Sequence, residues 1–79
     1  MSQKFPTATS DEIIRVLKII GFRFKRQSGS SHAIYYRDID KKRTCVPIHK
    51  TKDLKRNTLK AILLDAGLTV EEFIDLLKR

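Results

Sequence analysis

Apolar side chains recur at helical spacing early in the chain. Between Ile13 and Ile20 they fall three or four residues apart, which is the period of one face of an α-helix. Thr9 followed by Glu12 has the spacing of a capping box, in which each residue satisfies a backbone N–H of the other. Gly21 is suited to end a helix because glycine readily adopts a left-handed conformation. The pattern predicts a first helix that begins after Thr9 and ends before Gly21.

The middle of the chain has the two-residue period of β-strands. Residues 22–27 alternate apolar and basic side chains, which predicts a strand with one buried and one cationic face. Polar turns then separate two further predicted strands, over residues 32–37 and 43–48. Pro47 cannot donate a hydrogen bond to a neighbouring strand, so it marks either a sheet edge or the end of pairing.

Helical spacing returns in the last third of the chain. Residues 56–66 place apolar side chains at i, i+3, i+4 and i+7, and Gly67 ends this pattern. Thr69 and Glu72 repeat the capping box and predict a short last helix. The order α-β-β-β-α-α predicts a single small α+β domain with a three-stranded antiparallel sheet and helices packed on one face. We expect residues 1–8 to form a loose leader and residues 69–79 to form a C-terminal helical extension.

The length and charge of the chain limit the classes of partner that it can bind. The 79 residues suffice for one small domain, too small for a deep enclosed pocket. The net charge of +8 favours polyanions, with nucleic acid first and an anionic membrane second. No signal peptide or apolar run of membrane length is present, so we expect a cytoplasmic protein without a membrane partner. The single cysteine, Cys45, excludes an internal disulfide, and we expect it to be buried in its strand.

Most of the Lys and Arg residues lie between residues 22 and 60, on the predicted strands and at the entrance to the second helix. Phosphates bind well where basic side chains meet a helix N-terminus. A solvated basic face without a partner is the simpler alternative. The candidate phosphate-binding residues are Arg23, Lys25, Arg26, Lys50, Lys52, Lys55 and Arg56.

Two histidines could carry chemistry. His32 follows the polar turn of residues 28–31, and a histidine there could take the proton of an RNA 2′-hydroxyl because its pKa lies close to working pH. The alternative is an ordinary strand residue. His49 could contact phosphate or assist catalysis, or it could simply orient the basic loop that follows it. Their separation in sequence does not resemble a zinc site, and we expect no metal and no cofactor.

Adjacent tyrosines lie in the middle predicted strand. Because neighbouring strand residues point to opposite faces, one of Tyr35 and Tyr36 should belong to the core. The other could stack on a nucleic-acid base or shield the sheet.

Several short segments, in this order, resemble the HicA-type (YcfA-like) toxins of toxin–antitoxin pairs. They are Gly21-Phe22, Arg26-Gln27, Gly29-Ser30-Ser31-His32, Val46-Pro47-Ile48-His49 and the run from Thr58 to Leu68, which together cover about residues 10–68. The family commonly has Gly-Ser-His where this chain has Gly-Ser-Ser-His. Many members also have proline or glycine in place of Lys55-Arg56-Asn57.

The resemblance implies a fold similar to double-stranded-RNA-binding domains, metal-independent cleavage of mRNA and neutralisation by a HicB-type antitoxin. It assigns His32 as the catalytic histidine, and we expect Ser30, Ser31 and His49 to contact RNA beside it. Two other functions remain open: a non-catalytic RNA-binding regulatory module of the same fold, and a protein-interaction domain whose basic face docks an acidic partner.

Overall fold

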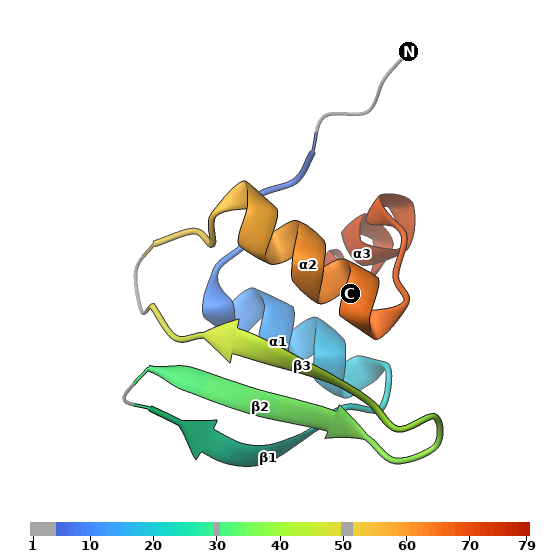
Figure 1. Cartoon of the computed structure of the whole chain (residues 1–79). Helices are drawn as coiled ribbons and strands as arrows, with labels where there is room; N and C mark the ends of the chain where they lie inside the picture. Colours follow the sequence, from blue (N-terminus) through green and yellow to red (C-terminus); the bar gives the residue numbers. More distant parts are fainter. Residues whose placement is uncertain (1–4, 30, 50–51) are drawn as a thin grey trace.

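The computed structural model describes residues 5–29, 31–49 and 52–79 of the chain (Figure 1). Its elements follow the order α-β-β-β-α-α, as the sequence predicts. They are α1 (Ser10–Ile19), β1 (Arg23–Ser28), β2 (His32–Arg37), β3 (Lys42–Pro47), α2 (Arg56–Ala66) and α3 (Val70–Leu77).

Both predicted capping boxes are present. At the start of α1, the Thr9 hydroxyl accepts a hydrogen bond from the Glu12 N–H, and the Glu12 carboxylate accepts one from the Thr9 N–H. Thr69 and Glu72 make the same reciprocal pair at the start of α3. Each pair satisfies backbone donors that would otherwise have no partner within the helix.

The three strands form one antiparallel sheet in the order β1-β2-β3. Within β2, Ala33 and Tyr35 are buried, while Tyr36 lies half-buried on the other face. Their partners on β3, Val46 and Thr44, are buried with them. The helices therefore cover one face of the sheet, and we call the opposite face the open face.

Strand β1 departs from the predicted alternation. Its register shifts between Phe24 and Arg26, so Lys25 has no direct partner on β2 and forms a bulge. The shift places Arg26 opposite Ile34, on the open face. Phe24 faces the helix side, where its ring meets that of Tyr35 edge-on at 5.8 Å between centroids, yet it remains 50% exposed. The expectation of a buried apolar face on β1 is therefore wrong at Phe24.

The expectation that Cys45 is buried is also wrong. Cys45 is exposed and pairs with Ile34 in β2. Because Thr44 and Val46 on either side of it point into the core, strand alternation directs the Cys45 side chain to the open face.

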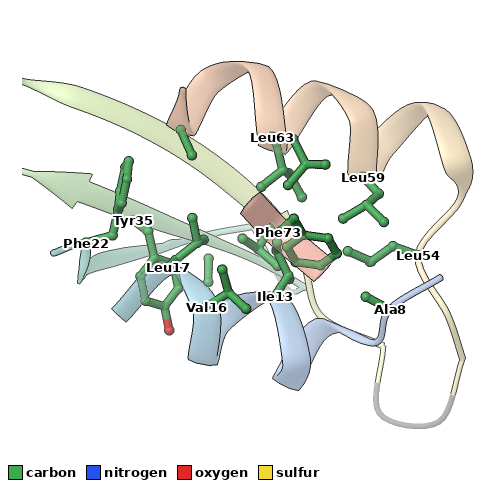
Figure 2. Close-up of a cluster of buried hydrophobic side chains, with 14 residues drawn as sticks. Ala8, Ile13, Val16, Leu17, Phe22, Tyr35, Leu54, Leu59, Leu63 and Phe73 are labelled. Atoms are coloured by element: carbon green, nitrogen blue, oxygen red, sulfur yellow. The ribbon is translucent and has the colours of Figure 1, made fainter. Parts of the chain in front are cut away.

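The core lies between the helices and the sheet (Figure 2). Ile13 and Leu17 of α1 and Leu59 of α2 are fully buried, and so is Phe73 of α3. Helix α3 packs against α1. At the other end of the chain, Ala8 is buried and its carbonyl accepts a hydrogen bond from the Leu54 N–H at 2.8 Å.

Arg37, at the end of β2, connects the sheet to two helix ends. Its guanidinium donates hydrogen bonds to the carbonyl oxygens of Ile20 (2.9 Å) and Ala66 (3.4 Å), which lie at the C-terminal ends of α1 and α2. It also makes a two-point ion pair with Asp40 and lies over the Phe22 ring. Carbonyls at helix C-termini lack partners within the helix, and a cation also interacts favourably with the helix dipole there. None of the described helices is long and apolar enough to cross a membrane.

Candidate nucleic-acid interface

A cleft of about 400 Å³ lies where β2 begins, β3 ends and α2 begins. It brings together four of the residues singled out in the sequence: His32, His49, Lys52 and Lys55. Its remaining lining residues are Pro47, Asp53, Leu54 and Thr58.

His32 is the first residue of β2 and pairs with Ser28 on β1 and Pro47 on β3. Its side chain is exposed and contributes to the cleft. The residue before it, Ser31, accepts a hydrogen bond through its carbonyl from the Ile48 N–H at 2.7 Å. The residue next to His32 is thus anchored to the segment that follows β3.

His49 reaches the cleft from the end of β3. Its backbone N–H donates a hydrogen bond to the Ser10 hydroxyl oxygen at 2.9 Å, and that hydroxyl donates to the Pro47 carbonyl at 2.6 Å. The position of His49 therefore depends on the first residue of α1. The His49 side chain itself is left exposed.

The start of α2 supplies the cationic side of the cleft. Lys55 is the N-cap of α2, and its side chain makes no capping hydrogen bond; the first turn contains no acidic residue. The N–H groups of that turn are therefore not capped by Lys55 and can bind an anion, beside a cleft that Lys52 and Lys55 line. Asp53 contributes a carboxylate to the same lining.

The remaining predicted cations lie apart from the cleft. Arg23 pairs with Tyr36, four residues along β2 from His32, which corresponds to about 13 Å in an extended strand. Lys25 lies over the Tyr36 ring at 4.7 Å, and Arg56 lies over the Phe5 ring at 5.1 Å. Arg26 lines a separate hollow on the open face. Ser30 and Lys50 lie outside the described residues.

Arg23 is engaged within the protein. It makes a two-point ion pair with Asp38, at 3.0 and 3.1 Å. This hydrogen bond is the main cause that lowers the pKa of Asp38 and raises that of Arg23. Asp38 is therefore an anion at neutral pH and offsets the charge that Arg23 could offer to a phosphate.

Two residues that the sequence did not single out as site residues contribute to this region. Thr58 lines the cleft from the first turn of α2, and Ser10 holds the backbone of His49. The position of Thr58 after a basic helix entrance is a signal that could have identified it. Ser10 gave no such signal, because its partners are 37 and 39 residues away.

Among the described residues, no group of three or more His, Cys, Asp or Glu side chains is arranged to hold a metal ion. The cleft thus offers two histidines, two lysines and a carboxylate, at the start of a helix whose N-cap side chain makes no capping hydrogen bond.

A family model described as the HicA toxin of bacterial toxin–antitoxin systems matches residues 10–68. The chain belongs to the HicA toxin family. The matched segment runs from the first residue of α1 to Leu68, so it contains every residue that lines the cleft. Helix α3 lies beyond it. A comparison with curated proteins gave no match. As a HicA toxin, the protein is one half of a toxin–antitoxin pair, and its family implies an antitoxin partner.

Proposed function

We propose that this HicA toxin is a metal-independent endoribonuclease that cleaves mRNA, with His32 as general base. The observation that carries the proposal is the cleft, which brings His32 and His49 together with Lys52 and Lys55 at an uncapped helix start. A base and an anion-binding site side by side are what the cleavage of RNA by its own 2′-hydroxyl requires.

The reaction begins with transfer of the 2′-hydroxyl proton to the neutral imidazole of His32. The 2′-oxygen then attacks the adjacent phosphorus, and the bond from phosphorus to the 5′-oxygen breaks. The products carry a 2′,3′-cyclic phosphate and a 5′-hydroxyl. The leaving 5′-oxygen takes up a proton, which protonated His49, His32 itself or water can supply.

Charge develops on the phosphoryl oxygens as the new bond forms. Lys52 and Lys55 and the backbone N–H groups at the start of α2 provide cations and hydrogen-bond donors for these oxygens. Lys55, in the segment Lys55-Arg56-Asn57 where many members of the family have proline or glycine, adds positive charge at this point. A phosphate seated there lies within the cleft that His32 lines.

The test compares the native protein with His32→Ala and His49→Ala. His32 is exposed, so its replacement should leave the folded structure and its thermal stability unchanged. We expect His32→Ala to abolish both growth arrest and RNA cleavage, and cleavage by the native protein to persist in EDTA. The new RNA ends should carry a cyclic phosphate.

Two outcomes would contradict the proposal: full cleavage by His32→Ala, or loss of native cleavage on chelation. A native protein that binds RNA tightly without ever cutting it would favour the non-catalytic RNA-binding module. If His49→Ala cleaves more slowly on the acidic side of the pH profile and no longer shows the fall in rate at alkaline pH, His49 supplies the proton to the leaving oxygen.

A further inference from the structure

The open face of the sheet carries a row of side chains that the cleft does not use. Strand β2 places His32, Ile34 and Tyr36 on this face, in line and two residues apart. The row therefore starts at the cleft, where His32 lies, and runs along β2 to Tyr36, about 13 Å away.

Cations flank this row on both neighbouring strands. Arg43 on β3 is the partner of Tyr36, and Arg26 on β1 is the partner of Ile34. The bulge at Lys25 adds another cation to the same face, because the Lys25 ammonium lies over the Tyr36 ring. Arg23 also lies there, but Asp38 neutralises it.

A depression on this face extends past β3 to α2. This depression of about 310 Å³ is lined by Arg26, Ile34, Arg43, Thr44, Cys45 and Asp65. Its carboxylate, Asp65, accepts a hydrogen bond from the Thr44 hydroxyl at 3.0 Å. The depression thus combines the apolar side chain of Ile34 with two arginines and one carboxylate.

We propose that this face is a track for single-stranded RNA, in which the strand runs along β2 from the cleft and one base stacks on Tyr36. The choice of RNA as the ligand rests on the proposed function. The surface chemistry selects the single strand: its bases are free to stack on an aromatic ring, whereas a duplex buries its base faces and presents only edges and phosphates. A base on Tyr36 displaces the Lys25 ammonium, which then pairs with the neighbouring phosphate.

Binding is measured on the full-length His32→Ala chain, so that cleavage does not interfere. The probes are a short, non-self-complementary RNA labelled with fluorescein and the same strand annealed to its complement. We expect tighter binding of the single strand. Tyr36→Leu should weaken the binding of the single strand by about 5- to 100-fold, which corresponds to the loss of one stacked base. Tyr36→Phe keeps the aromatic ring and should bind the single strand as tightly as the unchanged tyrosine.

A matched pair of charge variants tests the path of the strand. Arg43→Gln should weaken binding and lower the slope of log affinity against log salt by about 0.7, as expected for one phosphate contact. Lys18→Gln removes an exposed cation from α1, on the other side of the sheet, and should leave the slope unchanged.

The reactivity of Cys45 reports whether the bound RNA covers the depression. It is the only cysteine of the chain and is exposed within the depression. The single-stranded probe should slow its reaction with a maleimide several-fold, and Tyr36→Leu should relieve this protection at the same RNA concentration.

Unchanged affinity in Tyr36→Leu, equal binding of the duplex, or no protection of Cys45 would each overturn the track. These assays measure RNA binding and Cys45 protection rather than cleavage, so their failure and the failure of the proposed reaction are distinguishable. Tyr36-dependent binding without cleavage by the native protein would contradict the endoribonuclease and leave the track standing.

Discussion

The hydroxyl group of Ser10 joins the start of α1 to the backbone of His49. It accepts a hydrogen bond from the His49 N–H at 2.9 Å and donates one to the Pro47 carbonyl at 2.6 Å, and Ser10 is only 1% exposed. A single buried side chain thus fixes the path of the chain on one wall of the cleft.

Ser10→Ala should reduce both stability and activity. The substitution leaves the His49 N–H and the Pro47 carbonyl without their partner, which costs about 1–3 kcal/mol in the free energy of unfolding measured in urea. RNA cleavage should fall even where the variant is fully folded, because the wall that carries His49 shifts. Thr69→Ala is the control. It removes the N-cap of α3, which should lower the free energy of unfolding by about 1 kcal/mol, and it should leave RNA cleavage unchanged. Equal cleavage by the two variants would show that the position of His49 does not depend on Ser10.

The ion pair between Arg37 and Asp40 predicts a loss of stability in acid. The hydrogen bond from Arg37 is the main cause that lowers the pKa of Asp40 below its ordinary value of 3.8. A carboxyl group whose pKa is lower in the folded state stabilises the protein above its unfolded pKa, and this contribution is lost as the pH falls through the folded pKa. The unfolding temperature should therefore drop less steeply below pH 3.8 in Asp40→Asn than in the native protein.

Arg37→Met tests whether Arg37 is the main cause of the lowered pKa of Asp40. In this background, Asp40→Asn should change the pH dependence much less, because the guanidinium that is the main cause of the lowered Asp40 pKa is gone and only the weaker influence of Lys42 remains. A pH profile that responds to Asp40→Asn as strongly as in the native background would assign the effect to another group.

Gly21→Ala should destabilise the protein more than Gly29→Ala. Gly21 has a φ of +99°, and a Cβ there would lie 3.3 Å from Cδ of Arg37, which is itself held by two helix ends. Gly29 has a φ of +66° with open space around it, so alanine there meets only the backbone cost of about 1–2 kcal/mol. Thermal unfolding of both variants measures the difference. Equal losses would mean that Arg37 moves aside freely.

Phe73→Ala tests whether α3 belongs to the folded core although it lies beyond the segment matched by the family. Phe73 is fully buried, and its truncation should cost about 3–5 kcal/mol in the free energy of unfolding. Ile39→Ala removes an equally apolar side chain that is 90% exposed and should change stability by less than about 0.5 kcal/mol. If both variants unfold at the same urea concentration, α3 is an appendage that the core does not need.

The sequence pattern predicted the helices and strands well because their ends depend on residues that are close together in the chain. The capping boxes at Thr9 and Thr69 each involve residues three apart, and they begin helices where the sequence placed them. The strand over His32–Arg37 and the second helix over Arg56–Ala66 also have the predicted bounds. The gathering of His32 and His49 into one cleft was not evident from spacing, since it depends on how β3 returns along β2.

The errors arose from pairing between distant segments. The bulge at Lys25 changes which residues of β1 face the helices, and nothing in the local alternation reveals it. Cys45 was expected to be buried from the tendency of its residue type, but the register with Ile34 directs it outward. The sequence predicts that Arg23 binds phosphate, whereas the antiparallel pairing places it opposite Tyr36, at the far end of β2 from His32.

The bulge in β1 has a consequence for solubility. Strand β1 is an edge of the sheet, and its outer backbone groups could pair with an edge of another copy and begin aggregation. A bulge interrupts the regular hydrogen-bonding row that such a copy would need, and the lysine at its centre repels an equally charged neighbour. The irregularity that directs Arg26 to the open face thus also protects a bare sheet edge from self-association.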